Sequence, residues 1–486
     1  MGHASGCAPA VESFPARRRP PRPGAPARAR SSAAVPRASG SRRRARGPRR
    51  LRRRPAYSGI ARAPLPSPAG HRAGIVSSPR QTCAIILWIA HHEAGLTAKG
   101  IGFDARLIGA LGIGRYISGL LPKLALILGA RLTVVANRQD AAIVRALIGG
   151  LPHLMTVNAQ PYRLAEQSLL PLSLLRAELG LIHFPHYNLP LVKPGHFVVT
   201  VHDLFPFQFP QIHSGPLPRA VNQMLMRNAV RRADRIITPS KATALAVKQS
   251  FPGSADRVLA IPEAADDRFN ALRNPEGEAA WQTRLNIRPP YVFYLGQWKA
   301  YKNLPLLLEA FQIVRRTHPA SQLVLAGDDP RHPEVRQLAA ELPEGSIVLP
   351  GRLPESAVPD LYRGAAVVVL PSRAEGFGLP VIEAMACGVP VVCSDLPVLR
   401  EIADGVAIFC DPGDPAAFAR AMTEILDAGS GDRRRLGIER AKAYTWERAA
   451  QRTVEAYEMA LGIRLIGPAL EEHPGRRQDQ DLQVER

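Results

Sequence analysis

Short runs of apolar residues alternate with helix-like segments along most of the chain. In the first half, apolar runs predict buried strands at 101–104, 132–136, 181–184, 197–201, 235–238 and 257–261. Segments with helical spacing lie between several of them, at 117–128, 220–232 and 241–249. Because this alternation is typical of a parallel sheet with helices on both faces, the first half is predicted to form one α/β domain.

The same alternation starts again after a polar, proline-bearing stretch. Strands are predicted at 291–295, 322–326, 346–349, 365–370 and 389–393, and helices at 304–317, 334–341, 358–363, 379–386 and 415–426. Two successive α/β units predict two Rossmann-like domains that face a central cleft, with ligands at the carboxyl ends of the strands. The predicted boundaries are 98–264 for the first domain, 265–290 for an interdomain linker, 291–445 for the second domain and 446–466 for a final helix.

Positive charge is concentrated near the amino terminus. Residues 1–80 hold 19 of the 63 Lys and Arg side chains and one of the 41 acids, so the remaining 406 residues carry 44 bases and 40 acids. The Arg- and Pro-rich composition predicts a disordered extension at 1–97, and a polar tail at 467–486 is also predicted to be disordered. Two interpretations of the extension stay open: a segment that binds anionic lipid or nucleic acid, or, as we favour, upstream sequence translated from a misassigned start. Because the rest of the chain is nearly neutral, no nucleic-acid partner is expected.

Neither export nor a membrane-spanning helix is predicted. No stretch reaches the roughly 18 apolar residues that a spanning helix needs, and the closest one, 119–136, is interrupted by Lys123 and Arg131. The apolar run 83–90 lies too far into the chain for a signal peptide. The few cysteines show neither a disulfide framework nor paired metal-ligand spacing, which fits a reducing cytoplasm. They are Cys7, Cys83, Cys387, Cys393 and Cys410.

The most informative segment, 371–391, runs from a predicted strand through a glycine-bearing turn into a predicted helix. Pro380 suits the first turn of that helix, and Gly388 suits the position just past its end. The turn places the backbone N–H groups of residues 376–379 near a helix N-terminus, which favours phosphate or sugar oxygens. Glu375 lies in the turn and Glu383 in the first helical turn, so both are expected to face one pocket and accept hydroxyl hydrogen bonds. Without this setting, two glutamates at such a spacing would be ordinary surface groups.

In this setting the segment resembles the signature of glycosyltransferase family 4, a group of retaining enzymes that use nucleotide sugars and have the GT-B fold. The resemblance implies that Glu375 contacts the transferred sugar and that Glu383 holds the nucleotide ribose. It also implies that domain 291–445 binds the nucleotide sugar, whereas domain 98–264 lies on the acceptor side. The final helix would cross back onto the first domain, anchored by Trp446, although packing alone explains this tryptophan.

Two further segments of the second domain resemble the family's donor site. Lys302 matches a lysine that reaches the diphosphate, where a cation stabilises the charge that develops on the leaving group. Gln297 stands where many members have Arg, so one positive contact is missing or is supplied by Lys299. Leu353 lies in a turn that resembles the one meeting the nucleotide base.

The resemblance extends to the first domain. Gly112 and Gly114 resemble the glycine loop that closes over the donor phosphates, although Gly-x-Gly alone also fits a tight turn before a helix. The segments around His186 and His202 resemble bacterial mannosyltransferases of O-antigen and exopolysaccharide assembly. His202 matches a histidine beside the transferred sugar, and His186 has weaker support for the same role. Asp203 either orients His202 or caps the following turn.

These observations define the predicted site. The predicted catalytic residues are His202, Glu375 and Lys302. The predicted donor-binding residues are Gly112, Gly114, Gln297, Lys302, Leu353, Gly376, Phe377, Gly378, Leu379 and Glu383. No metal is expected, because nothing in the two predicted domains resembles the Asp-x-Asp metal motif of the other major transferase fold.

The resemblance also implies the substrates. It favours GDP-mannose as the donor and a glycan or polyprenyl-linked oligosaccharide as the acceptor, with transfer on one face of the sugar. The expected location is the cytoplasm, with peripheral association at the inner membrane face. Two alternatives are a GT-B phosphorylase or nucleotide-sugar hydrolase or epimerase, and a polyanion-binding protein that acts through its Arg-rich extension.

Overall fold

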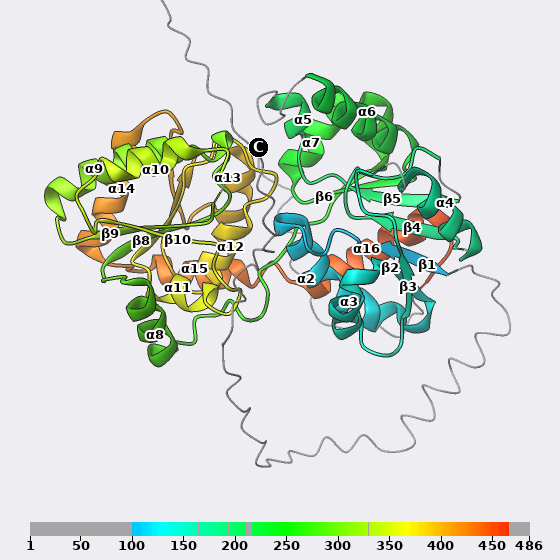
Figure 1. Cartoon of the computed structure of the whole chain (residues 1–486), viewed down its shortest axis with the longest axis horizontal. Coiled ribbons are helices and arrows are strands. Elements are labelled where there is room, and N and C mark those ends of the chain that lie inside the picture. Colours follow the sequence, from blue (N-terminus) through cyan, green and yellow to red (C-terminus); the bar gives the residue numbers. More distant parts are fainter. Residues whose placement is uncertain are drawn as a thin grey trace, which may run out of the picture. The chain divides into compact units, whose positions relative to one another are not determined.

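The computed structural model describes residues 100–465 except 164–165, 178, 193–194, 210–215 and 329. The described residues lie in one compact unit and form two separate parallel sheets (Figure 1). The predicted extension at 1–97 and the predicted tail at 467–486 lie outside the described residues. We call the parts built on the first and second sheets the N-terminal and C-terminal domains.

The N-terminal domain contains a seven-stranded parallel sheet within the described residues, in the order β3-β2-β1-β4-β5-β6-β7. Its strands are β1 (Ile101–Asp104), β2 (Leu132–Asn137), β3 (His153–Val157), β4 (Leu181–Phe184), β5 (His196–Thr200), β6 (Arg235–Thr238) and β7 (Val258–Ala260). Its α-helices are α2 (Leu111–Leu128), α3 (Ala141–Ile148), α4 (Glu166–Arg176), α5 (Phe205–Gln208), α6 (Pro216–Arg232) and α7 (Lys241–Ser250). Strand β3 was not predicted, because it is an edge strand whose side chains are mostly outside the core.

The C-terminal domain repeats this design with six parallel strands in the described part of the chain, in the order β10-β9-β8-β11-β12-β13. The strands are β8 (Tyr291–Leu295), β9 (Gln322–Ala326), β10 (Ile347–Gly351), β11 (Val367–Leu370), β12 (Val391–Ser394) and β13 (Ile408–Cys410). The helices are α9 (Leu304–Thr317), α10 (Pro333–Ala340), α11 (Val358–Gly364), α12 (Leu379–Ala386), α13 (Pro397–Ala403), α14 (Pro415–Ala428) and α15 (Arg433–Ala441).

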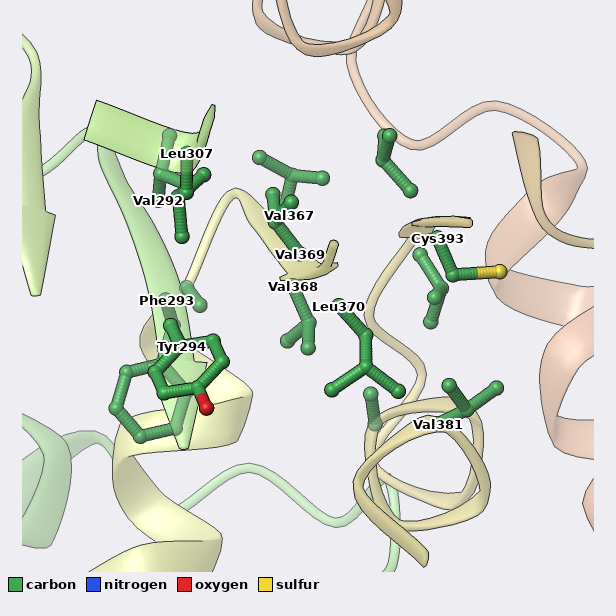
Figure 2. Close-up of a cluster of buried hydrophobic side chains, with 14 of the residues drawn as sticks. Val292, Phe293, Tyr294, Leu307, Val367, Val368, Val369, Leu370, Val381 and Cys393 are labelled. Atoms are coloured by element: carbon green, nitrogen blue, oxygen red, sulfur yellow. The ribbon is translucent and has the colours of Figure 1, made fainter. Parts of the chain in front are cut away.

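The strands of the C-terminal domain are apolar on both faces because helices cover both sides of the sheet. Figure 2 shows β-branched and aromatic side chains of β8 and β11 clustered with Leu307 of α9 and Val381 of α12. Burial of one such side chain stabilises the fold by about 1.5–3 kcal/mol. This packing holds α12 against β11, and therefore holds the turn that joins them.

Each sheet reverses its strand order once. In the N-terminal domain β1 lies between β2 and β4, and in the C-terminal domain β8 lies between β9 and β11. Ligands of such sheets bind beyond the carboxyl ends of the strands at this reversal. The loops after β8 and β11, which carry Lys302 and Glu375, start at the reversal of the C-terminal sheet. The loop after β5, which carries His202, starts at the carboxyl end of the strand next to β4.

Helix α2 begins earlier than the sequence pattern indicates. The prediction of a glycine loop at 112–116 is wrong, because these residues form the start of the helix. The connecting loop is 105–110. Gly114 is required by close approach, since a Cβ there would lie 2.3 Å from the carbonyl oxygen of Ile108. Among the described residues, the segment Leu111–Arg131 alone is long and apolar enough to cross a membrane, but half of it is buried inside the protein.

Two helices connect or complete the domains. The predicted linker contains helix α8 (Pro275–Leu285), which packs against α11. Helix α16 (Trp446–Leu461), red in Figure 1, packs against α2, β5 and β6 of the N-terminal domain. Its Trp446 is buried against Gly119, as the family resemblance implies.

Candidate active site

The turn between β11 and α12 forms as the sequence predicts. Gly378 is the residue before the helix and has a φ of 109°, a left-handed conformation that glycine adopts without strain. Pro380 lies in the first turn of α12, where its missing N–H breaks no helical hydrogen bond. Phe377 is buried and Leu379 starts the helix. The start of α12 is thereby placed at the carboxyl end of β11.

Glu375 and Lys302 form an ion pair within the C-terminal domain. The Lys302 Nζ donates to Glu375 Oε1 at 2.7 Å and to Oε2 at 3.0 Å. The Lys302 side chain is 14% exposed and the Glu375 side chain 8%, so both charges are mostly removed from water. The structure thus brings together two of the three predicted catalytic residues, from the loops after β8 and β11.

Glu383 is almost fully buried, with 2% exposure, and both of its oxygens have protein partners. Tyr362 donates its hydroxyl to Oε2 at 3.0 Å, and Arg115 of α2 donates to Oε1. Burial raises the pKa of Glu383, although Arg115 and Tyr362 act in the opposite direction. Glu383 is the fifth residue of α12, just beyond the first helical turn in which the sequence placed it.

His202 lies between two acceptors in the N-terminal domain. Its Nδ1 is 3.0 Å from Glu263 Oε1, and its Nε2 is 2.9 Å from the carbonyl oxygen of Pro185. Burial lowers the pKa of His202, but the hydrogen bond and charge of Glu263 outweigh it, so the pKa is raised overall. A protonated ring satisfies both acceptors because each nitrogen then donates a hydrogen bond. His202 therefore fits a positively charged imidazolium.

The backbone of His202 lies against the backbone of Gly376 in the β11–α12 turn. A Cβ on Gly376 would lie 2.0 Å from the carbonyl oxygen of His202, so a side chain there would prevent this approach. The carbonyl oxygen of Gly376 accepts hydrogen bonds from Ser240 Oγ at 3.0 Å and Thr243 Oγ1 at 2.9 Å. The turn next to Glu375 is thus held by residues of the N-terminal domain.

The two polar neighbours of His202 have distinct surroundings. Asp203 caps the following turn, since its Oδ1 accepts from the backbone N–H of Phe205 at 2.9 Å. Burial raises the pKa of Asp203. His186 accepts from the backbone N–H of Asn188 through Nδ1, at 3.1 Å, and burial lowers the pKa of His186 to about 3. His186 therefore stays neutral and carries its proton on Nε2.

The remaining predicted donor-site residues lie beyond the carboxyl ends of the C-terminal strands and at the start of α2. Gln297 follows β8, and its carbonyl oxygen accepts from the Tyr294 hydroxyl at 3.1 Å. Leu353 follows β10 and packs against the C-terminal core. Gly112 is exposed at the start of α2, whereas Gly114 is buried.

Arg115, like Tyr362 and Glu263, is a residue of this site whose role the sequence did not reveal. It belongs to the Gly-x-Gly segment, but its partner Glu383 lies 268 positions away in the chain. No sequence signal connects the two. Burial tends to lower the pKa of Arg115, but the charge of Glu383 outweighs it and raises this pKa, so the guanidinium stays charged.

The described residues offer no group of three or more His, Cys, Asp or Glu side chains that could hold a metal ion. Independence from metals stays a prediction. Cys387, Cys393 and Cys410 are buried free thiols, and Cys7 and Cys83 lie outside the described residues. The site contains paired charges and backbone groups arranged at the carboxyl ends of parallel strands.

Comparison with known proteins gives matches over both domains. A family described as Glycosyltransferase Family 4 matches residues 111–269, and one described as glycosyl transferases group 1 matches residues 276–443. The O-antigen chain mannosyltransferase B of Escherichia coli is 30% identical over 282 residues, which cover 57% of this chain and 74% of that protein. The D-inositol 3-phosphate glycosyltransferase of Acidothermus cellulolyticus is 26% identical over 306 residues, which cover 60% of this chain and 66% of that protein.

Solved structures show the same architecture. Anabaena Alr3699/HepE in complex with UDP-glucose superimposes with a TM-score of 0.61, covering 74% of this chain and 99% of that one. The two sequences are 20% identical, so the likeness is one of fold.

Proposed function

Since this chain belongs to glycosyltransferase family 4 and has the GT-B fold, we propose that it transfers a hexose from a nucleotide diphosphate sugar, with retention of anomeric configuration. The acceptor in this proposal is a glycan or a polyprenyl-linked oligosaccharide. The observation that carries the proposal is the largely buried Lys302–Glu375 pair beside the start of α12.

Each predicted catalytic residue has a role in this proposal. Lys302 stabilises the negative charge on the departing diphosphate, an effect that is strong where water is excluded. Glu375 and His202 position the sugar, while Glu383 receives the ribose hydroxyls. The acceptor oxygen forms the new bond to the anomeric carbon on the face that the phosphate leaves, and the leaving phosphate oxygen takes the acceptor's proton. Positioning and charge stabilisation then supply most of the rate enhancement.

We favour mannose, and therefore GDP-mannose, as the donor. Support comes from the Escherichia coli relative, whose name describes an O-antigen mannosyltransferase. The relatives also include inositol phosphate glycosyltransferases, so the donor panel below covers several nucleotides and sugars.

The proposal places the reaction in the cytoplasm, with peripheral association at the inner membrane face. Helix α4 supports this association because it exposes Leu172 and Leu175 next to Arg176. Apolar side chains beside a cation suit the boundary of an anionic membrane. A polyanion-binding function through the Arg-rich extension has less support, because the other 406 residues are nearly neutral.

A nucleotide-sugar panel tests the proposed activity, using the full chain and a form that starts near residue 97. We expect consumption of one nucleotide sugar, dependent on an added acceptor. Lys302→Ala is expected to lower kcat by about 100- to 1,000-fold, because a charge that stabilises the leaving group is lost. Glu383→Ala is expected to weaken binding of the donor nucleotide.

Lys442→Ala is the matched control, since Lys442 forms an exposed pair with Glu439. It should behave like the parent. If no nucleotide sugar is bound or consumed, or if both site variants behave like the parent, the proposed donor site is wrong. Turnover without an acceptor, or turnover that requires phosphate, would instead identify a hydrolase, epimerase or phosphorylase.

A further inference from the structure

Arg115 joins the start of α2 to the nucleotide side of the C-terminal domain. One guanidinium nitrogen, Nη1, bonds Glu383 Oε1, and Nη2 lies 3.6 Å from Glu355 Oε2. The guanidinium also lies over the ring of Phe269, 5.8 Å from its centroid. The Arg115 side chain is 24% exposed, so this charge is held mainly by protein groups.

This contact blocks the role that Glu383 has in the proposed function. Glu383 is 2% exposed and already binds Tyr362 and Arg115, so a ribose cannot reach it while both partners stay in place. Tyr362 is fully buried within the C-terminal domain, whereas Arg115 comes from the other domain and retains some exposure. Arg115 is therefore the partner that a ribose would displace.

At position 297 the donor site lacks a positive charge that the family resemblance implies, and Lys299 is the alternative source of that charge within the C-terminal domain. Gln297 is neutral where many members have Arg, and Lys302 is paired with Glu375. Glu383 lies four residues after the start of α12, about 6 Å along the helix axis. Glu383, which holds the Arg115 guanidinium, thus lies about one helical turn from the end of α12 that attracts anions.

Once a ribose has displaced Arg115 from Glu383, the Arg115 guanidinium is suited to bind a diphosphate. A guanidinium offers paired donors that match two phosphate oxygens, and it stays charged at any relevant pH. Glu355 would not retain it, because Arg268 Nη2 already binds Glu355 Oε2 at 2.6 Å.

We propose that Arg115 is a donor-binding residue: it holds Glu383 before the donor binds, and it moves to the diphosphate when the ribose binds Glu383. It then supplies, from the N-terminal domain, the cation that Gln297 does not provide. This inference rests on the proposed function, and its ligand class is a nucleoside diphosphate.

Binding of a nucleoside and of its diphosphate, measured by calorimetry on the full chain, separates this role from a structural one. We use guanosine with GDP and uridine with UDP. For the pair that the parent binds, Arg115→Gln should weaken diphosphate binding by about 10- to 100-fold, the loss of one charge-assisted contact. Nucleoside binding should stay the same or tighten, because Glu383 becomes free.

Two further variants test the charge itself. Arg115→Lys keeps the cation and should recover part of the diphosphate affinity. Gln297→Arg, added to Arg115→Gln, should also recover part of it by restoring the cation from the other side. Thermal unfolding of each variant checks that the chain is folded.

Equal weakening of nucleoside and diphosphate binding in Arg115→Gln would show that Arg115 only ties the domains together, and the inference would be overturned. Unchanged binding of both ligands in Arg115→Gln, or no recovery of diphosphate affinity in either rescue variant, would overturn it as well. If the parent binds none of the four compounds and consumes no nucleotide sugar, the proposed function fails, and this inference fails with it.

Discussion

At the scale of single residues, the His202–Glu263 pair makes stability depend on pH. The pKa of His202 is raised in the folded protein, so the pair's stabilisation is fully present below a pH of about 6.5 and is lost as the pH rises through the raised pKa. We expect Glu263→Gln to lower the pKa of His202, because burial then acts without the opposing carboxylate. The variant should lose about 1–3 kcal/mol of unfolding free energy at pH 6, as measured by urea denaturation.

The same variant should lose the decline in stability between pH 6 and pH 8. Nuclear magnetic resonance titration of the histidines measures the pKa directly. Glu334→Gln is the control, because Glu334 pairs with His332 at a more exposed position, 2.7 Å from its Nδ1. An unchanged pKa for His202 in Glu263→Gln would contradict the assignment of this pair.

Residue-scale prediction from sequence succeeds where a local motif carries the chemistry. Glu375 and Lys302 were recognised because each belongs to a short segment with a characteristic neighbourhood, and the structure pairs them. The Arg115–Glu383 and His202–Glu263 contacts join positions 268 and 61 residues apart. Such partners are selected by the folded backbone, so no pattern along the chain identifies them.

At the scale of elements, the contact between α2 and α16 depends on Gly119. A Cβ at this position would lie 2.1 Å from the Trp446 indole, which is itself buried. We expect Gly119→Ala to lower the free energy of unfolding by about 1–3 kcal/mol, because the indole or a helix must shift. Chemical denaturation measures the change.

Gly112→Ala is the matched substitution in the same helix. A Cβ there meets no atom within 4 Å, so this variant should gain about 0.5–1 kcal/mol from the better helix propensity of alanine. Changes of the same sign and size in both variants would show that packing against Trp446 does not decide the outcome.

Element boundaries explain two of the sequence-based errors. The glycines at 112 and 114 favoured a loop, but α2 tolerates them because its other residues bury a large apolar face and Gly114 permits close backbone contact. Helix α8 was missed because its composition is polar. Its start nevertheless carries a readable signal, since the Asn274 side chain caps the helix and Pro275 and Glu276 occupy its first turn.

At the scale of the whole molecule, the two-domain plan was the most predictable feature. Buried parallel strands are apolar on both faces and leave a strong pattern in each half of the chain. The contacts between the halves leave no such pattern, because they join single residues far apart in the chain, such as Phe205 with Tyr301 and Ser240 with Gly376. One group of these contacts surrounds the start of α7.

The start of α7 ties the domains together through Glu401 of α13. The Glu401 carboxylate accepts from the backbone N–H groups of Lys241 at 2.9 Å and Ala242 at 3.1 Å. Acceptors for these first-turn N–H groups, and a negative charge near them, stabilise a helix start. We expect Glu401→Ala to lower the free energy of unfolding by about 1–2 kcal/mol, and Glu401→Gln by less, because glutamine keeps an acceptor oxygen.

Hydrogen exchange gives a local measurement of the same effect. The amides of Lys241 and Ala242 should exchange faster in Glu401→Ala, and the donor KM should rise because Ser240 and Thr243 also hold Gly376 next to Glu375. Glu424→Ala, which removes an exposed partner of Arg433, should change neither quantity. If Glu401→Ala leaves both exchange and KM at parental values, the start of α7 does not couple the N-terminal domain to the donor site.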